Sequence, residues 1–243
     1  MPEGPSIVIL KEAVSAFAGK KIISVTGNSK IDQQLLLNKK VLGFKSWGKH
    51  FLICFKGFTV RIHFLLFGSY LINDKKDRPV RLSVVFINGE INLYACAIKI
   101  IEGNIDELYD WSTDVMNDLW NVKNAVAQLR RQKNKFICDV LLDQDIFAGV
   151  GNIIKNEVLY RVRVHPESVA DKFPLAKAKE IVKEARNYSF EFLEWKQKFE
   201  LKKHWLAHTK KTCKRCQLPF IKKHTGVRKR RSFYCINCQQ LYD

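Results

Sequence analysis

Two C-x-x-C pairs stand near the end of the chain: Cys213-Lys214-Arg215-Cys216 and, eighteen residues later, Cys235-Ile236-Asn237-Cys238. Each pair can direct two thiolates at one ion, and the spacer is long enough for a β-hairpin. Because all four ligands would be cysteines, no position stays open for a catalytic water, and the pattern predicts one structural Zn²⁺. Disulfides are the alternative, but we see no signal peptide and expect an intracellular protein, in which disulfides are rare. The other cysteines are isolated in apolar surroundings and are expected to be buried thiols: Cys54, Cys96 and Cys138.

The sequence around the two cysteine pairs is strongly basic. Residues 196–231 contain fourteen Lys or Arg and one acidic residue, Glu200. The whole chain of 243 residues has 42 Lys and Arg against 24 Asp and Glu, a net charge of +18. Such an excess favours a polyanionic partner, most often nucleic acid. A membrane is disfavoured, because the sequence has neither a basic amphipathic start nor an apolar run long enough to span a bilayer.

The N-terminal residues, Met1-Pro2-Glu3-Gly4-Pro5, suggest a reactive pair. If Met1 is removed, which the small Pro2 side chain permits, Pro2 becomes a free secondary amine. Such an amine can attack an electrophilic sugar carbon and form an iminium. Glu3 is next to it and can act as a general acid/base. The alternative is a disordered terminus that carries a Pro and a Glu by chance.

The hydrophobic pattern changes near Gly103. Residues 5–17 predict a helix, and residues 22–101 predict short strands with tight turns at Lys56-Gly57 and Asn88-Gly89. From residue 105 the apolar spacing is helical, over 105–130 and again over 174–195. These patterns predict a β-sandwich or barrel followed by helices, and so an α+β fold.

Gly149-Val150-Gly151-Asn152 precedes a predicted helix. Backbone N–H groups at a helix start bind phosphate, and Asn152 would add a side-chain donor. This motif is weak by itself, since an ordinary loop between two helices has the same pattern.

Four features of the sequence follow one another along the chain: the start 2–5, the turn Gly48-Lys49-His50, the segment 149–152 and the four-Cys finger. In these features and in their order, the sequence resembles the formamidopyrimidine-DNA glycosylase and endonuclease VIII family. The resemblance covers essentially the whole chain. Gly4 resembles the endonuclease VIII branch, because the formamidopyrimidine branch typically has Leu there. The resemblance implies a helix and β-sandwich domain (1–103), a helix–two-turn–helix domain (104–204) and a zinc finger (205–243), with DNA in the cleft between domains.

The resemblance also implies a role for each matching residue. Pro2 is similar to the family's Schiff-base nucleophile and Glu3 to its general acid/base. Lys49 resembles the lysine that contacts phosphate near the lesion and completes the catalytic group. The remaining DNA contacts are implied at Asn152, Glu157 and Arg230.

Leu66 stands where many relatives have a Met or another wedge residue. A Leu can still fill the space left by a flipped base, whereas packing in the core is the alternative. The neighbours that complete the wedge in relatives are not identifiable in this sequence.

The implied function is a bifunctional DNA glycosylase and abasic-site lyase that excises oxidised bases, preferably pyrimidines, through a proline Schiff base and β/δ-elimination. Its partner would be double-stranded DNA with an oxidised base or abasic site, bound by a monomer. Two alternatives stay open: the same fold acting on oxidised purines, and a non-catalytic zinc-dependent protein that binds damaged DNA. Binding alone does not need the Pro2-Glu3 pair, and RNA-module signatures are lacking.

Overall fold

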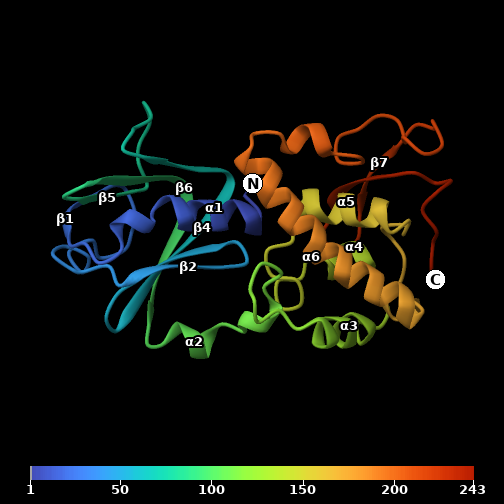
Figure 1. Cartoon of the computed structure of the whole chain (residues 1–243), viewed down its shortest axis with the longest axis horizontal. Helices are drawn as coiled ribbons and strands as arrows, with labels where there is room; N and C mark the ends of the chain where they lie inside the picture. Colours follow the sequence, from blue (N-terminus) through green and yellow to red (C-terminus); the bar gives the residue numbers. More distant parts are fainter. Residues whose placement is uncertain (1) are drawn as a thin grey trace. The chain divides into compact units, whose positions relative to one another are not determined.

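The computed structural model describes residues 2–243, and the chain forms two compact units (Figure 1). The first unit ends at Asp110, and the second spans Trp111–Asp243. Residues 205–243, expected to form a separate finger, belong to the second unit. The predicted α+β class is confirmed, because the first unit is built on a sheet and the second on helices with a C-terminal hairpin.

An antiparallel six-stranded sheet in the order β1-β5-β6-β4-β3-β2 forms the first unit. Its strands are β1 (Ile22–Thr26), β2 (Gly43–Trp47), β3 (His50–Cys54), β4 (Phe58–Ile72), β5 (Leu82–Phe86) and β6 (Gly89–Glu102). The turn before β4 contains Gly57, as predicted. The β5–β6 turn lies one residue earlier than predicted, at Ile87-Asn88, because Phe86 pairs with Gly89.

The core of the first unit joins strands from distant positions in the sheet. Helix α1 (Gly4–Ala13) and the 3₁₀ turn Ser15–Phe17 replace the single helix predicted over residues 5–17. Their apolar side chains lie in one buried cluster with residues of β1, β3, β4, β5 and β6. This cluster extends from β1, at one edge of the sheet, to β3, next to the other edge. The start of α1 is therefore held by the main packing of the unit.

The helical segment predicted over residues 105–130 does not form as one element, because only its last part, Val122–Arg130, is a longer helix and residues 105–120 differ. These residues form α2 (Ile105–Leu108), a 3₁₀ turn (Trp111–Thr113) and an irregular segment. Asp114 Oδ1 accepts from Met116 N, and Asn117 Oδ1 accepts from Leu119 N. These side chains offer the backbone local hydrogen bonds that compete with a helix.

Four α-helices form the core of the second unit: α3 (Val122–Arg130), α4 (Ile137–Val140), α5 (Asn152–Arg161) and α6 (Leu175–Gln197). Helix α6 begins after Pro174, as its sequence predicts, and its buried side chains contact those of α3 and α5. In residues 2–243 we find no helix with both the length and the apolar character needed to cross a bilayer.

The hairpin of strands β7 (Ile221–Thr225) and β8 (Arg230–Tyr234) follows, and it packs against α5. It lies between the two cysteine pairs, as the spacing predicts.

Candidate functional site

Pro2 and Glu3 lie directly before α1. Pro2 is half-buried, and Glu3 is 3% exposed and has extended backbone. The carbonyl of Glu3 accepts a hydrogen bond from Ser6 N at 2.8 Å, and Pro5 occupies the first turn, where its missing N–H costs no helical bond. The helix thus fixes the backbone of Glu3 directly before the first turn of α1. The predicted removal of Met1 lies outside the described residues.

Lys49 lies in the two-residue turn between β2 and β3. Gly48 has a positive φ of 53°, and Trp47 pairs with His50 across the turn. Trp47 Nε1 donates to the carbonyl of Asp110 at 2.9 Å, and the hydroxyl of Tyr109 lies 3.1 Å from His50 Nδ1. The residues on both sides of Lys49 are therefore anchored to residues 109–110, the last residues of the first unit.

His50 stays neutral over the physiological range. Burial lowers its pKa to about 4, and the positive charges of Arg61, His63 and Lys49 act in the same direction. A neutral imidazole at this position avoids repulsion of the neighbouring Lys49 ammonium group.

Leu66 lies in a bulge of β4. Residues 65–68 of β4 face a single residue of β6, Ala95, because pairing passes from Phe64↔Cys96 to Ser69↔Tyr94. Leu66 is 57% exposed and Phe67 is 79% exposed, which excludes core packing for Leu66. A Cβ on Gly68 would lie 2.8 Å from the carbonyl oxygen of Ala95, so the bulge needs glycine there.

Asn152 begins α5 directly after the glycine segment. Gly149 has a positive φ of 98°, and its N–H donates to Gln144 Oε1 at 3.1 Å. The Asn152 side chain donates through Nδ2 to the carbonyl of Arg231 at 3.0 Å, while its Oδ1 is buried without a hydrogen-bond partner in the described residues. The structure thus gives Asn152 a contact with the hairpin that its sequence motif does not indicate.

Glu157 is fully buried, and its carboxylate is used inside the protein. It accepts hydrogen bonds from the backbone N–H groups of Leu206, Ala207 and His208 at 2.7–2.9 Å. Burial raises its pKa, and these three bonds oppose that shift. The geometry favours a positioning role for Glu157, in place of the direct DNA contact that the resemblance implies.

Lys155 and Asn156 are buried polar neighbours of Asn152 and Glu157 that the sequence analysis does not single out. Lys155 Nζ is fully buried and donates to Ser232 Oγ at 2.8 Å, and Asn156 Oδ1 accepts from Phe233 N at 3.1 Å. The signal in the sequence is three consecutive polar residues on a helix that has no polar face. Such a helix is buried on all sides, so its polar side chains must find partners in the protein.

Arg230 begins β8 and is exposed, together with the other three basic residues of 228–231. It pairs with Thr225 of β7. Thr225 Oγ1 lies 2.6 Å from Ser232 Oγ in the buried interior of the hairpin. The hairpin therefore presents the basic residues outward and buries its neutral hydroxyl groups.

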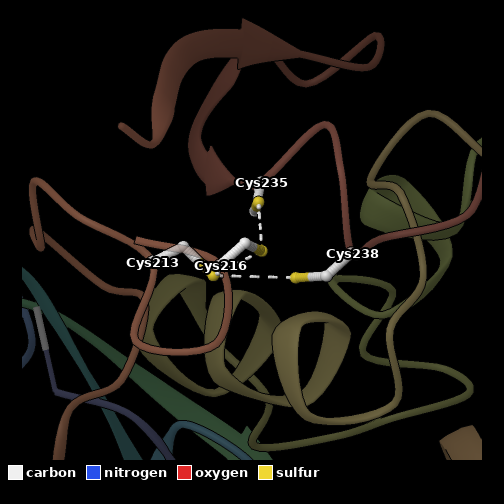
Figure 2. A group of neighbouring side chains, drawn as sticks. All are labelled: Cys213, Cys216, Cys235 and Cys238. Atoms are coloured by element: carbon white, nitrogen blue, oxygen red, sulfur yellow. Dashed lines mark hydrogen bonds between the residues drawn. The ribbon is translucent and has the colours of Figure 1, made fainter. Parts of the chain in front are cut away.

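The sulfur atoms of Cys213, Cys216, Cys235 and Cys238 all lie within 4.8 Å of one another, and Figure 2 shows them converging on one point. Contacting pairs are separated by 3.4–3.7 Å. Zn–S bonds of about 2.3 Å in a tetrahedron place the sulfurs about 3.8 Å apart. The donor set therefore fits a structural Zn²⁺, whereas the separations are too long for disulfides.

The isolated cysteines are not equally buried. Cys96 and Cys138 are buried as expected, and burial raises the pKa of their thiols to about 12 and about 11. Cys54 is only partly buried.

Comparisons with known proteins find similarity to formamidopyrimidine-DNA glycosylases and endonuclease 8-like proteins. Residues 112–199 match a family model described as the formamidopyrimidine-DNA glycosylase H2TH domain. The chain is 27% identical over 236 residues to endonuclease 8-like 3 of Xenopus laevis, an alignment that covers 90% of this chain and 38% of the relative. It is 28% identical over 201 residues to formamidopyrimidine-DNA glycosylase of Carboxydothermus hydrogenoformans, with 76% of this chain and 75% of the relative covered.

The fold has close counterparts among solved structures. Formamidopyrimidine-DNA glycosylase of Lactococcus lactis, bound non-covalently to DNA that contains an abasic site, superposes with a TM-score of 0.85 at 20% identity. That match covers 98% of this chain and 99% of the other. The chain spans 34–38% of the length of its endonuclease 8-like 3 relatives.

Proposed function

Because the chain belongs to the formamidopyrimidine-DNA glycosylase and endonuclease VIII family, we propose that it is a bifunctional DNA glycosylase and abasic-site lyase of base excision repair. Its substrate is duplex DNA that carries an oxidised base, preferably a pyrimidine, or an abasic site. One chain supplies every residue that the proposal uses, so it acts as a monomer on DNA inside the cell.

The reacting group is the secondary amine of Pro2 after removal of Met1. The target nucleotide leaves the base stack, since its C1′ cannot be reached inside the duplex. The Pro2 nitrogen attacks C1′, the bond from C1′ to the base breaks, and the departing base takes up a proton. The Pro2 nitrogen loses its proton, the C1′–O4′ bond breaks, and O4′ takes up a proton, so that the sugar ring opens. The resulting iminium makes the C2′ proton acidic. Loss of that proton expels the 3′ phosphate by β-elimination, and δ-elimination of the 5′ phosphate can follow.

Glu3 is the group that moves these protons. Its position next to Pro2 keeps the carboxyl close to the amine, and its burial removes competing water. The chemistry needs a carboxyl group that can both donate and accept a proton, which glutamine cannot do.

The remaining residues bind DNA. Lys49, Asn152 and Arg230 contact phosphates, and Leu66 fills the space left by the flipped base. The exposure of Leu66 on an anchored bulge supports the wedge role, since an exposed apolar side chain there has no packing function. A Zn²⁺ held by the four cysteines would supply no chemistry to the reaction; it would join the two ends of the hairpin segment.

The observation that carries the proposal is the Pro2-Glu3 pair, with Glu3 97% buried before a helix that is packed into the core. The experiment is borohydride trapping on three duplexes, which carry an abasic site, an oxidised pyrimidine or an oxidised purine. Wild-type protein with confirmed Met1 removal is compared with Pro2→Gly, Glu3→Gln and an N-terminally blocked form.

We expect a covalent band that blocking abolishes, and excision that Glu3→Gln removes while DNA binding is retained. The ratio of the excision rates on the two damaged-base duplexes decides between a preference for pyrimidines and a preference for purines. Tight, salt-sensitive binding without a covalent band on any duplex would support the non-catalytic alternative.

A further inference from the structure

The tip of the hairpin, residues 226–228, is held by a carboxylate from the helical part of the same unit. Asp139 of α4 accepts a hydrogen bond from Val227 N at 2.8 Å through Oδ2 and one from Arg228 N at 3.1 Å through Oδ1. Both carboxylate oxygens thus bind adjacent backbone N–H groups of the tip. Hydrogen bonds to a charged acceptor are stronger than neutral ones, so this contact restricts the tip more than an ordinary loop contact would.

The tip conformation fits this carboxylate closely. Gly226 has a positive φ of 68°, and a Cβ at this position would lie 2.2 Å from Asp139 Oδ2. Any other residue would therefore collide with the carboxylate and would also strain the backbone. Gly226 permits the close approach of the Asp139 carboxylate, and that carboxylate binds the two N–H groups that follow Gly226. The two residues are therefore fitted to each other.

A second anchor lies on the other side of Arg230. The carbonyl of Arg231 accepts from Asn152 Nδ2 at 3.0 Å and from Lys155 Nζ and Asn156 Nδ2 at 3.3 Å. Residues 227–228 and residue 231 are thus both fixed to the helical part of the unit, whereas the Arg230 side chain between them is exposed.

We propose that Asp139 is a positioning residue for Arg230. By holding residues 227–228, it sets the direction in which the first residue of β8 presents its guanidinium group. Without Asp139 the segment before Arg230 would keep only the contacts within the hairpin itself, among them the pairing of Arg230 with Thr225. The Arg230 side chain would then lose orientation at the moment of phosphate contact. This inference rests on the proposed DNA-binding function of Arg230.

The test compares Asp139→Ala, Asp139→Asn, Arg230→Ala and the double variant Asp139→Ala/Arg230→Ala. Asp143→Ala is the matched control, because Asp143 is on the same segment but accepts from Asp145 N within its own turn. Zinc content and thermal unfolding establish that each variant is folded. The readouts are the Kd for a duplex with an abasic-site analogue, its salt dependence, and lyase kcat at saturating DNA.

We expect Asp139→Ala to raise Kd on the order of tenfold and to leave kcat and zinc content unchanged. Asp139→Asn keeps one oxygen acceptor and should have a smaller effect, and Asp143→Ala should resemble wild type. In the Arg230→Ala background, Asp139→Ala should change Kd little, because the group it positions is already gone.

Additive effects of the two substitutions would overturn the inference, as would an unchanged Kd in Asp139→Ala. Zinc loss in both Asp139 variants would also overturn it, since Asp139 would then support only the fold. The proposed function is tested separately: if wild type binds the duplex without lyase activity, catalysis fails while the coupling between Asp139 and Arg230 can still be measured in Kd.

Discussion

The sheet of the first unit and the hairpin of the second hold their exposed residues by different means. In the sheet, strands with fully buried apolar side chains surround one core, and the bulge that carries Leu66 protrudes from paired strands. The hairpin has little core of its own. It is fixed by four cysteines and by polar side chains, among them Asp139, Asn152, Lys155 and Asn156.

This difference determines how each region responds to change. Apolar packing loses free energy in proportion to the side-chain volume removed, and its cost spreads over many neighbours. A hairpin held by a metal and by directed hydrogen bonds depends on a few atoms, so removal of one group can release it while the rest of the chain stays folded.

Removal of zinc should have the largest effect. Structural zinc contributes about 10 kcal/mol or more to the folding of zinc-finger peptides. We expect chelation to reduce DNA affinity by about a hundredfold or more, because the basic residues of 228–231 lose their fixed positions. Circular dichroism should show the sheet intact. Cys54→Ala is the control, and DNA affinity that survives complete zinc removal would contradict the role given to the finger.

Leu93→Ala tests the other side of the comparison, the sheet of the first unit. Leu93 is fully buried in the core of the sheet, so the substitution should lower the free energy of unfolding by about 2–5 kcal/mol. Urea unfolding measures this loss, and zinc content should stay at one ion per chain. Ile87→Ala, at a residue that is 83% exposed, should change stability by less than about 0.5 kcal/mol. Zinc loss in folded Leu93→Ala would show that the two regions are not independent.

His50 should make the first unit sensitive to acid. Its pKa of about 4 in the folded state is below the ordinary 6.5, so the unfolded chain binds more protons between these values. The stability contribution is complete above pH 6.5 and is lost as the pH falls toward 4, by about 2 kcal/mol at pH 5. Urea unfolding at pH 7.5 and pH 5 should show this loss in wild type and in His224→Gln. His50→Gln should reduce it, and an equal loss in that variant would argue against His50 as its source.

Glu157→Gln should have a moderate effect on stability. The substitution keeps one oxygen acceptor for the three N–H groups of residues 206–208 but removes the charge. We expect a loss of about 1 kcal/mol in unfolding free energy, measured by urea titration, with no change in the salt dependence of DNA binding. A change in DNA affinity at unchanged stability would favour direct contact with DNA instead.

Leu66→Ala should have the smallest effect on stability, within about 0.5 kcal/mol of wild type, because the side chain is exposed. If Leu66 fills the space of the flipped base, excision from duplex DNA should fall several-fold while zinc content and melting temperature stay the same. Single-turnover excision measures this effect, with Ile87→Ala as the exposed control. Equal rates for Leu66→Ala and wild type would remove Leu66 from the site.

Features encoded by local chemistry could be predicted from the sequence. The cysteine spacing predicts four convergent sulfurs, and alternation predicts the strands of the first unit. Residues 105–120 were mispredicted, because apolar spacing does not reveal that Asp114 and Asn117 bind the backbone locally. The bulge at residues 65–68 was also hidden, since Leu65-Leu66-Phe67 has the composition of a buried strand.

The roles of α5 could not be predicted, for a different reason. Glu157 and Lys155 have partners some fifty and seventy-six residues later in the chain. Three consecutive polar residues on this helix indicate that they need partners inside the protein, but which groups those partners are depends on where the finger packs, and no local pattern records that. Asp139, 88 residues before the N–H that it binds at Val227, is a further example.

The bulge of β4 allows the sequence of residues 65–67 to vary while the rest of the first unit stays the same. Pairing is in register on both sides of it, from Phe58↔Glu102 to Phe64↔Cys96 and from Ser69↔Tyr94 to Ile72↔Ile91. Residues could be exchanged, added or removed at positions 65–67 without moving one core side chain to the opposite face of the sheet. The surface offered at this point can therefore diverge among descendants of this chain while the scaffold beneath it is inherited unchanged.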